Sequence, residues 1–190
     1  MNFYSDQIIA EIIKDSSLTN KIKIKELYTK IEDFKAVNKF AVINMSAYDI
    51  KTDYTTCLLE DKNNTIAFYC LDKEFSVKNS PSSLIFRKYK YRNKIQYCIL
   101  FACTETEYRG KGYASKMMDG FIDRIRQENS KNKGLDIKIV LNSFESSVLF
   151  YVNYGFTWTG DSILKYPKLL NHEVYDEAKE YFIMELIITI

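Results

Sequence analysis

The residues best suited to chemistry lie where a predicted strand gives way to a predicted helix, in the run Arg109-Gly-Lys-Gly-Tyr-Ala114. A helix start presents backbone N–H groups without an acceptor inside the helix, and about half a positive charge from the peptide dipoles. Gly110 and Gly112 have no Cβ, so an anion can approach their amides closely. The cations Arg109 and Lys111 would be unfavourable in the first turn of a bare helix, by about 0.3–1 kcal/mol each. The run therefore predicts a site for a phosphate or pyrophosphate, with a spacing unlike the P-loop or dinucleotide patterns.

Periodicity predicts the elements that position this run. Helical spacing of apolar residues predicts helices within the first forty residues (faces Ile8, Ile9, Ile12, Ile13 and Ile24, Leu27, Ile31, Phe34), at Gly112–Glu128 and at Glu145–Asn153. The predicted strands are Phe40–Met45, Thr55–Leu59, Thr65–Leu71, Ser83–Tyr91, Ile95–Cys103, Ile137–Leu141 and Tyr181–Thr189. The turn-forming residues 61–64 predict an antiparallel hairpin between the second and third of these, and the apolar run Ile137–Leu141 predicts parallel pairing. We expect an α/β (α+β) sheet with a central βαβ unit in a single domain over residues 1–190, with residues 1–50 forming N-terminal helices and the first strand.

Two motifs in this frame resemble a known family. Arg109–Ala114 (Arg-x-x-Gly-x-Ala), after a strand and before a long helix, resembles the acyl-CoA signature of the GNAT superfamily of N-acyltransferases. Tyr151–Phe156 (Tyr-x-x-x-Gly-Phe) resembles the family's downstream element, in the family's order and separation. The match covers residues 55–190, and its specific part residues 98–156. The resemblance implies a mixed, mostly antiparallel central sheet with a βαβ acyl-CoA-binding core and flanking helices.

The resemblance also implies roles for individual residues. The backbone of Arg109, Gly110, Lys111, Gly112, Tyr113 and Ala114 would hold the pyrophosphate of acetyl-CoA. The strand backbone at Cys103 and Thr104 would pair with the pantetheine amides. Phe144 stands where many family members have an Asn, and Asn142 is the candidate to replace that missing amide contact. Tyr151 matches the tyrosine that protonates the departing thiolate, which suits a phenol that is neutral at pH 7. The implied reaction is transfer of an acetyl group to a primary amine, on a polypeptide or a small molecule, by direct attack in a ternary complex without a metal.

The general base stays unassigned in the sequence. The positions that match the family's strand glutamates hold Cys98 and Ile139, and Phe144 replaces a frequent Asn. Glu105 and Glu60 are nearby candidates, and a water chain or an already neutral amine is equally open. The missing glutamate motivates an alternative: a catalytically inactive GNAT-like protein that binds acyl-CoA, a polypeptide or a nucleic acid.

A basic stripe runs through the middle of the chain. Lys88, Lys90, Arg92 and Lys94 alternate with Tyr89 and Tyr91, which predicts four cations on one face of a strand and two aromatics on the other. Lysines commonly protect an edge strand from pairing with another sheet. The same stripe is also compatible with docking of nucleic acid or an acidic polypeptide.

The composition of the chain limits which partners, metal centres and cellular compartments we expect for it. The formal net charge of +2 gives no bulk field for nucleic acid, and the single imidazole, His172, excludes a multi-histidine metal centre. Cys57, Cys70, Cys98 and Cys103 lie among apolar neighbours without a C-x-x-C pair, as is typical of buried thiols in a reducing compartment. The sequence has no signal-peptide layout and no apolar run long enough to span a bilayer. We therefore expect a cytoplasmic protein, monomeric or homodimeric, with no membrane partner.

Overall fold

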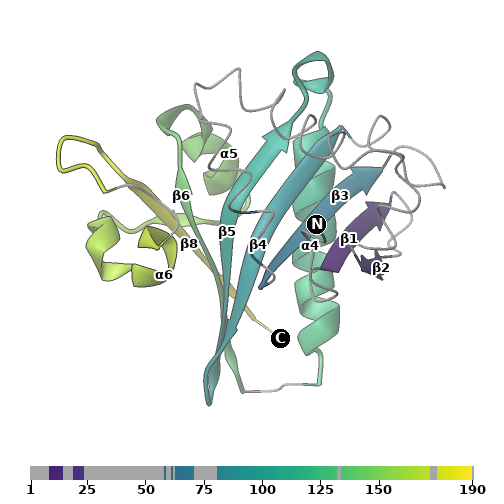
Figure 1. The fold of residues 1–190 in the computed structure, drawn as a ribbon, viewed down its shortest axis with the longest axis horizontal. Helices are drawn as coiled ribbons and strands as arrows, with labels where there is room; N and C mark the ends of the chain where they lie inside the picture. Colours follow the sequence, from purple (N-terminus) through teal and green to yellow (C-terminus); the bar gives the residue numbers. More distant parts are fainter. Residues whose placement is uncertain are drawn as a thin grey trace, which may run out of the picture. The chain divides into compact units, whose positions relative to one another are not determined.

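The computed structural model describes residues 9–14, 19–23, 58, 61, 63–70, 81–131, 134–171 and 175–189 (Figure 1). The chain folds as two compact units: Met1–Ile85 with Phe101–Glu128, and Phe86–Leu100 with Asn129–Ile190. The strands in chain order are β1 (Ile9–Lys14), β2 (Thr19–Lys23), β3 (Asn64–Cys70), β4 (Ser82–Lys90), β5 (Lys94–Thr104), β6 (Asp136–Ser143), β7 (Thr157–Trp158) and β8 (Phe182–Ile188). The α-helices are α4 (Tyr113–Asn129), α5 (Val148–Asn153) and α6 (Pro167–Leu170), and the 3-10 turns are η2 (Thr106–Tyr108), η3 (Glu145–Ser147) and η4 (Ile163–Lys165).

The first unit includes the whole of β1, β2 and β3, the beginning of β4, the end of β5 and nearly all of the long amphipathic helix α4. β1 pairs antiparallel with β2 and parallel with β3, in the register Ile9↔Lys23 and Ile9↔Thr65. The helix α4 runs behind β3 (Figure 1), and its apolar stripe is buried as predicted: Met117, Met118, Phe121, Ile122 and Ile125. The Tyr113 ring at the start of α4 contacts Tyr69 of β3, with ring centroids 5.9 Å apart.

The prediction of helices in the first forty residues is wrong for Ile9–Lys14 and Thr19–Lys23, which are strands. Apolar pairs repeat every four residues there, which fits a helix, but β-branched residues also favour strands. Because β1 lies between β2 and β3, strand pairing satisfies its backbone groups on both edges. The predicted helical face Ile24, Leu27, Ile31 and Phe34 and the predicted strand Phe40–Met45 lie outside the described residues.

The prediction of an antiparallel hairpin between Thr55–Leu59 and β3 is also wrong. Leu58, the described residue of the expected strand Thr55–Leu59, has a helical backbone. The expected turn does form: the Asn64 amide donates to Asp61 O at 2.9 Å, and the buried Asn64 side chain donates to Leu58 O at 2.8 Å. The neighbours of β3 in the sheet are β1, in parallel, and β4, so neither edge of β3 is left for an antiparallel partner from residues 55–59.

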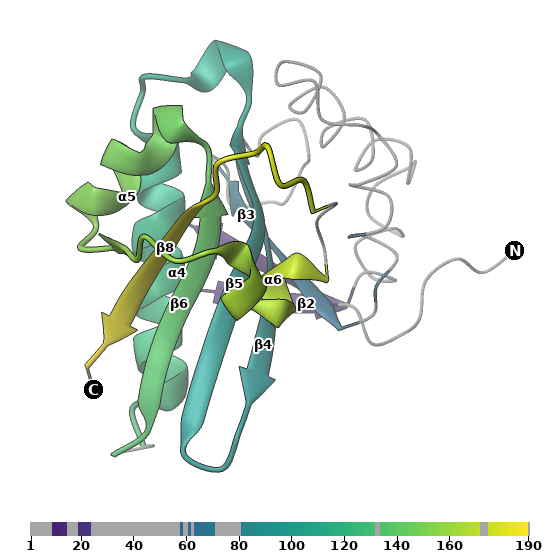
Figure 2. The same ribbon diagram turned by 90° about the vertical axis from the view of Figure 1, so that its left-hand side faces the viewer.

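The second unit contains the predicted parallel pair. β5 and β6 pair in parallel from Lys94↔Asp136 to Ile99↔Leu141, and α4 connects them in sequence, which confirms the βαβ prediction. β8 pairs antiparallel with both β6 and β7. Figure 2 shows α5 and α6 on opposite sides of β6 and β8. On the α6 side, Ile163 and Leu169 bury a cluster of strand residues: Cys98, Val140 and Ile183.

The basic stripe does not lie on one strand. Lys88 and Lys90 belong to β4, Arg92 lies in the turn, and Lys94 begins β5. Tyr91 N donates to Lys94 O at 2.8 Å, which closes the turn. The four cations therefore do not lie along one strand, because the chain reverses after Lys90.

No helix within the described ranges is long and apolar enough to cross a membrane.

Candidate functional site

The segment that joins β5 to α4 is fixed by hydrogen bonds on both sides of the turn. Thr104 Oγ1 lies 2.8 Å from Ser82 Oγ, and the Glu105 amide donates to Pro81 O at 2.8 Å. Arg109 Nε donates to Thr104 O at 3.0 Å, so the side chain of the first motif residue spans the turn. Arg109 therefore holds the end of β5 close to the start of the glycine loop, in addition to supplying charge.

The glycine loop has a backbone that only glycine adopts readily. Gly110 and Gly112 have φ angles of 72° and 81°, in the left-handed region. A Cβ added at either would meet no atom within 4 Å, so the space in front of both is open. Lys116 N donates to Gly112 O at 3.0 Å in the first helical hydrogen bond, and the amides of Gly112, Tyr113 and Ala114 precede it. With no acidic residue in the first turn of α4, these donors and the open space fit an anionic group such as a pyrophosphate.

Two lysines are held beside this loop by tyrosine rings. Lys111 Nζ lies 5.5 Å from the centroid of the Tyr108 ring. Lys116 Nζ lies 5.6 Å from the ring of Tyr69 and 5.9 Å from that of Tyr113. Cations over aromatic faces are favourable in themselves, so these lysines need no carboxylate partner to be placed there. The sequence interpretation missed Lys116, although its position one helical turn after Gly112 was available as a signal.

Cys103 and Thr104 form the end of β5, beyond the last pair that β5 makes with β6 at Ile99↔Leu141. Burial raises the pKa of the Cys103 thiol to about 12 and that of Cys98 to about 11. Thiols with such values stay protonated at neutral pH and are poor nucleophiles. Any contribution of Cys103 to a site is therefore through its backbone.

Tyr151 lies in the helix-ending motif of α5. The Gly155 amide donates to Val152 O at 2.9 Å and the Phe156 amide to Tyr151 O at 3.1 Å, with Gly155 at a φ of 84°. These two bonds are the Schellman pattern, and the rings of Tyr151 and Phe156, 5.5 Å apart, make its hydrophobic contact. The motif Tyr-x-x-x-Gly-Phe is thus a helix cap that fixes the tyrosine ring. Tyr151 is buried, and desolvation raises the pKa of its phenol to about 12.

No protein-family model matches the chain, and no curated protein is similar in sequence. Among solved structures, a GNAT-family acetyltransferase from Staphylococcus aureus Mu50 superposes with a TM-score of 0.58 at 14% identity, covering 83% of this chain and 96% of that one. Tetrahymena Gcn5 superposes with a TM-score of 0.56 at 13% identity, covering 82% and 87%. The NatC complex bound to Gag peptide and CoA superposes with a TM-score of 0.54 at 20% identity, covering 83% and 92%.

The chain has the GNAT fold. The fold expected from the two motifs is therefore confirmed. Within it, the first unit holds the predicted loop residues together with Cys103 and Thr104, and the second unit holds Tyr151 and Asn142.

The other residues that the sequence suggested for the site lie in different environments. Asn142 lies on β6 opposite Ile183 and is half-buried. Ile139 is completely buried. The pKa of the Glu105 carboxyl is raised, first by burial and then by the negative charge of Glu107. Glu60 and His172 lie outside the described residues. No group of three potential metal ligands is found among the residues that the structure describes.

Proposed function

We propose that this protein transfers an acetyl group from acetyl-CoA to a primary amine. The observation that carries the proposal is the glycine loop between β5 and α4, with two left-handed glycines, open space in front of both and lysines beside it. The fold supports it, since the NatC structure with this fold is bound to CoA and a peptide. Bound acetyl-CoA supplies an activated thioester, whose acyl carbon an amine can attack.

In this proposal, separate parts of the chain bind the pyrophosphate, bind the pantetheine arm and polarise the thioester. The amides of Gly112, Tyr113 and Ala114 hold the pyrophosphate, with Lys111 adding charge, while Arg109 keeps the turn in place through Thr104 O. The backbone of Cys103 and Thr104 pairs with the pantetheine amides as an added strand, and the amide near Thr104 polarises the thioester carbonyl. Asn142 gives a further amide contact. Holding the thioester and the amine in alignment supplies most of the rate.

Tyr151 assists the departure of the thiolate. Because its pKa is raised to about 12, the phenol is neutral throughout the physiological range and can donate a hydrogen bond. A thiol has a pKa of about 8.5, so complete proton transfer from so weak an acid is unfavourable. We infer that Tyr151 stabilises the developing negative charge on sulfur chiefly by this hydrogen bond, and that the ring contacts with Phe150 and Phe156 orient it.

The proposal is tested with acetyl-CoA and three acceptors: a short peptide with a free N-terminus, an N-acetylated peptide containing one lysine, and spermidine. We expect free CoA thiol to be released with at least one of them, with the acetylated acceptor seen by mass spectrometry. Tight CoA binding without thiol release above hydrolysis would instead favour the catalytically inactive acyl-CoA-binding protein. Failure to bind CoA at all would show that the glycine loop has another role.

A further inference from the structure

The end of the β4–β5 hairpin gathers positive charge that the proposed reaction does not use. Lys88 and Lys90 lie at the end of β4, Arg92 lies in the turn, and Lys94 begins β5. The chain has no acidic residue between Lys88 and Lys94. Because the formal net charge of +2 gives no bulk field for a polyanion, any attraction of that kind must come from a local patch.

The turn between α4 and β6 lies beside the hairpin end and adds a further cation. Asp136 N donates to Asn93 O at 3.1 Å, which joins the first residue of β6 to the hairpin turn. Figures 1 and 2 both show the start of β6 next to the hairpin end. Lys131 is exposed at the start of the α4–β6 turn. We call residues 90–94 together with Lys131 the basic patch.

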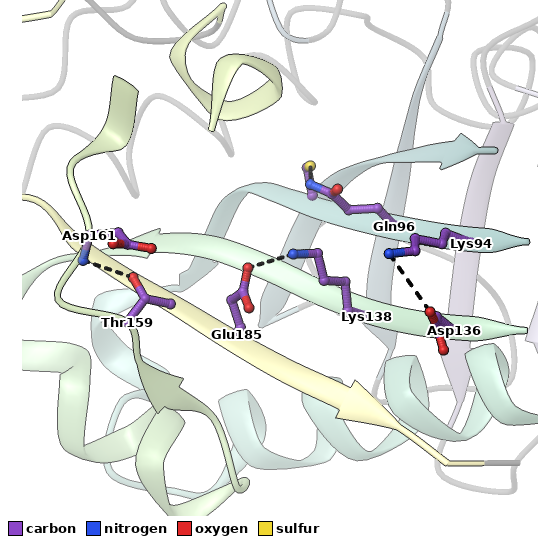
Figure 3. A network of polar contacts seen from close by, with 8 residues as sticks. Lys94, Gln96, Asp136, Lys138, Thr159, Asp161 and Glu185 are labelled. Atoms are coloured by element: carbon purple, nitrogen blue, oxygen red, sulfur yellow. Dashed lines mark hydrogen bonds and ion pairs between the residues drawn. The ribbon is translucent and has the colours of Figure 1, made fainter. Parts of the chain in front are cut away.

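The carboxylate of Asp136 offsets little of this charge. Asp136 Oδ2 lies 3.8 Å from Lys94 Nζ (Figure 3), and the two side chains are 74% and 62% exposed. An exposed pair at this distance contributes little to stability and is screened by salt. Among the described residues, neither Lys90 nor Arg92 forms an ion pair. The patch therefore keeps a net positive charge.

These cations do not have the role that lysines commonly have at a sheet edge. β4 lies between β3 and β5 in the sheet order, so it is an internal strand. Lysines on an internal strand do not protect a free edge from pairing with another sheet. Like charges close together in the chain repel one another, and a bound anion removes that repulsion.

An aromatic ring lies exposed among the cations of the patch. Tyr91, between Lys90 and Arg92, is 45% exposed. Its amide donates to Lys94 O at 2.8 Å, so the turn has its conformation before any ligand arrives. A ring flanked by cations suits an unpaired base that stacks on it while the neighbouring phosphates contact the cations. An acidic polypeptide has no base to stack there, and residues 90–94 include no aliphatic side chain that would enter a lipid surface.

We propose that the basic patch binds single-stranded nucleic acid. Tyr91 stacks on an unpaired base, and the phosphates contact four cations: Lys90, Arg92, Lys94 and Lys131. Such a surface recognises a strand by its charge and its unpaired bases and not by a base sequence. The inference goes beyond the proposed transferase function and does not depend on it, because this binding needs neither acetyl-CoA nor an amine.

Binding is measured by fluorescence anisotropy without acetyl-CoA, using labelled oligouridylate and oligothymidylate of about 12 nucleotides. With four phosphate contacts, the logarithm of the association constant should fall against the logarithm of the salt concentration with a slope of about −2.8. The affinity should then fall about 50-fold between about 50 mM and about 200 mM salt. Binding of either oligonucleotide supports the proposal, and the tighter one identifies the strand as RNA or DNA.

A charge-matched pair of double variants tests the position of the site. Lys90→Gln with Arg92→Gln removes two of the four phosphate contacts, so the slope should become about −1.4. Lys165→Gln with Lys179→Gln removes the same charge from two exposed lysines outside the patch and should keep the wild-type slope. Both double variants lower the formal net charge from +2 to 0, so a difference between them reports position and not total charge.

Two variants of Tyr91 test the stacking. Tyr91→Ala should lower the affinity at least about fivefold and leave the salt slope unchanged, because it removes a ring and no charge. Tyr91→Phe keeps the ring and should bind as wild type does. Substitutions at such exposed positions change stability little, and thermal melts should show the same Tm for both variants and the wild type.

The inference is overturned if the wild type binds neither oligonucleotide at about 50 mM salt, or if the two double variants lose affinity equally. It is also overturned if Tyr91→Ala binds as tightly as the wild type. Displacement of the labelled strand by polyglutamate, as effective at equal charge as unlabelled oligonucleotide, would indicate an acidic polypeptide as the partner instead. None of these outcomes bears on the transferase proposal, because the assay contains no acetyl transfer.

Discussion

Replacing Gly112 by alanine separates the folding role of this glycine from its proposed role in binding. Gly112 and Gly134 have nearly the same backbone, with φ angles of 81° and 84°, and a Cβ at either meets no atom within 4 Å. Gly112 is the first of the three residues whose amides we propose to hold the pyrophosphate, whereas Gly134 lies in the turn before β6. Gly134→Ala is therefore a matched control for the strain of the substitution.

The expected loss of stability is similar for the two variants. Left-handed backbone costs an alanine about 1–2 kcal/mol, and loss of glycine's freedom in the unfolded chain returns about 0.4–1 kcal/mol. The net destabilisation is about 1 kcal/mol, or about 2–4 °C in Tm for a protein of this size. Thermal melts without ligand should show this shift for both.

The two variants should differ once CoA is added. At a CoA concentration of about 100 times Kd, binding stabilises the wild type by about 2.7 kcal/mol. A Cβ at Gly112 enters the space that the pyrophosphate would take, so we expect at least about a tenfold loss of affinity, which removes about 1.4 kcal/mol of that stabilisation. Gly112→Glu should abolish the CoA-induced shift. If Gly112→Ala and Gly134→Ala keep the same CoA-induced shift as wild type, the loop does not hold the coenzyme.

The other predictions concern the tyrosine, its helix cap and the thiols. Tyr151→Phe should lower turnover far more than CoA affinity, and unchanged turnover would remove Tyr151 from the mechanism. Because the pKa of the Tyr151 phenol is raised to about 12, wild-type activity should show no loss from its ionisation below about pH 11. Gly155→Ala places left-handed backbone on alanine, and its Cβ would lie 3.6 Å from Leu186 Cδ1, an ordinary contact distance. Urea unfolding should therefore show a net loss of about 1 kcal/mol, as for Gly112→Ala, and a neutral result would contradict the cap. Peptide mapping after iodoacetamide treatment at pH 7.5 should find Cys98 and Cys103 largely unmodified in the folded protein and modified after denaturation, because burial raises the pKa values of both thiols.

Both motifs could be interpreted from the sequence because their geometry is local. In Tyr151–Phe156 the two capping hydrogen bonds and the ring contact all lie within six consecutive residues. In Arg109–Ala114 the left-handed glycines and the helix start are likewise set by adjacent residues. The apolar stripe of α4 is also a local feature, since helical periodicity depends on residues three and four positions apart. Helical and strand periodicity predicted an α/β fold with a βαβ unit, and the resemblance of the two motifs to the GNAT superfamily predicted the GNAT fold.

The errors fall where distant segments compete for the same backbone. Ile9–Lys14 carries a pattern that fits a helix, and the presence of β2 and β3 as partners makes it a strand. Thr55–Leu59 carries a strand pattern, yet β1 takes the place beside β3. Propensity differences of under about 1 kcal/mol per residue are small against strand pairing along both edges, so local preference did not decide.

The sequence by itself determined the positions of the glycine loop and the capped Tyr151, because the conformations of both are set by residues a few positions apart. Only the tertiary structure decided that the α4–β6 turn lies beside the cations of the β4–β5 hairpin, because that relation passes through the register of β5 and β6 and the hydrogen bond from Asp136 N to Asn93 O. A shift of one residue in this pairing would turn every side chain of β6 to the opposite face. Register depends on packing across the whole sheet, so no short stretch of the chain encodes it.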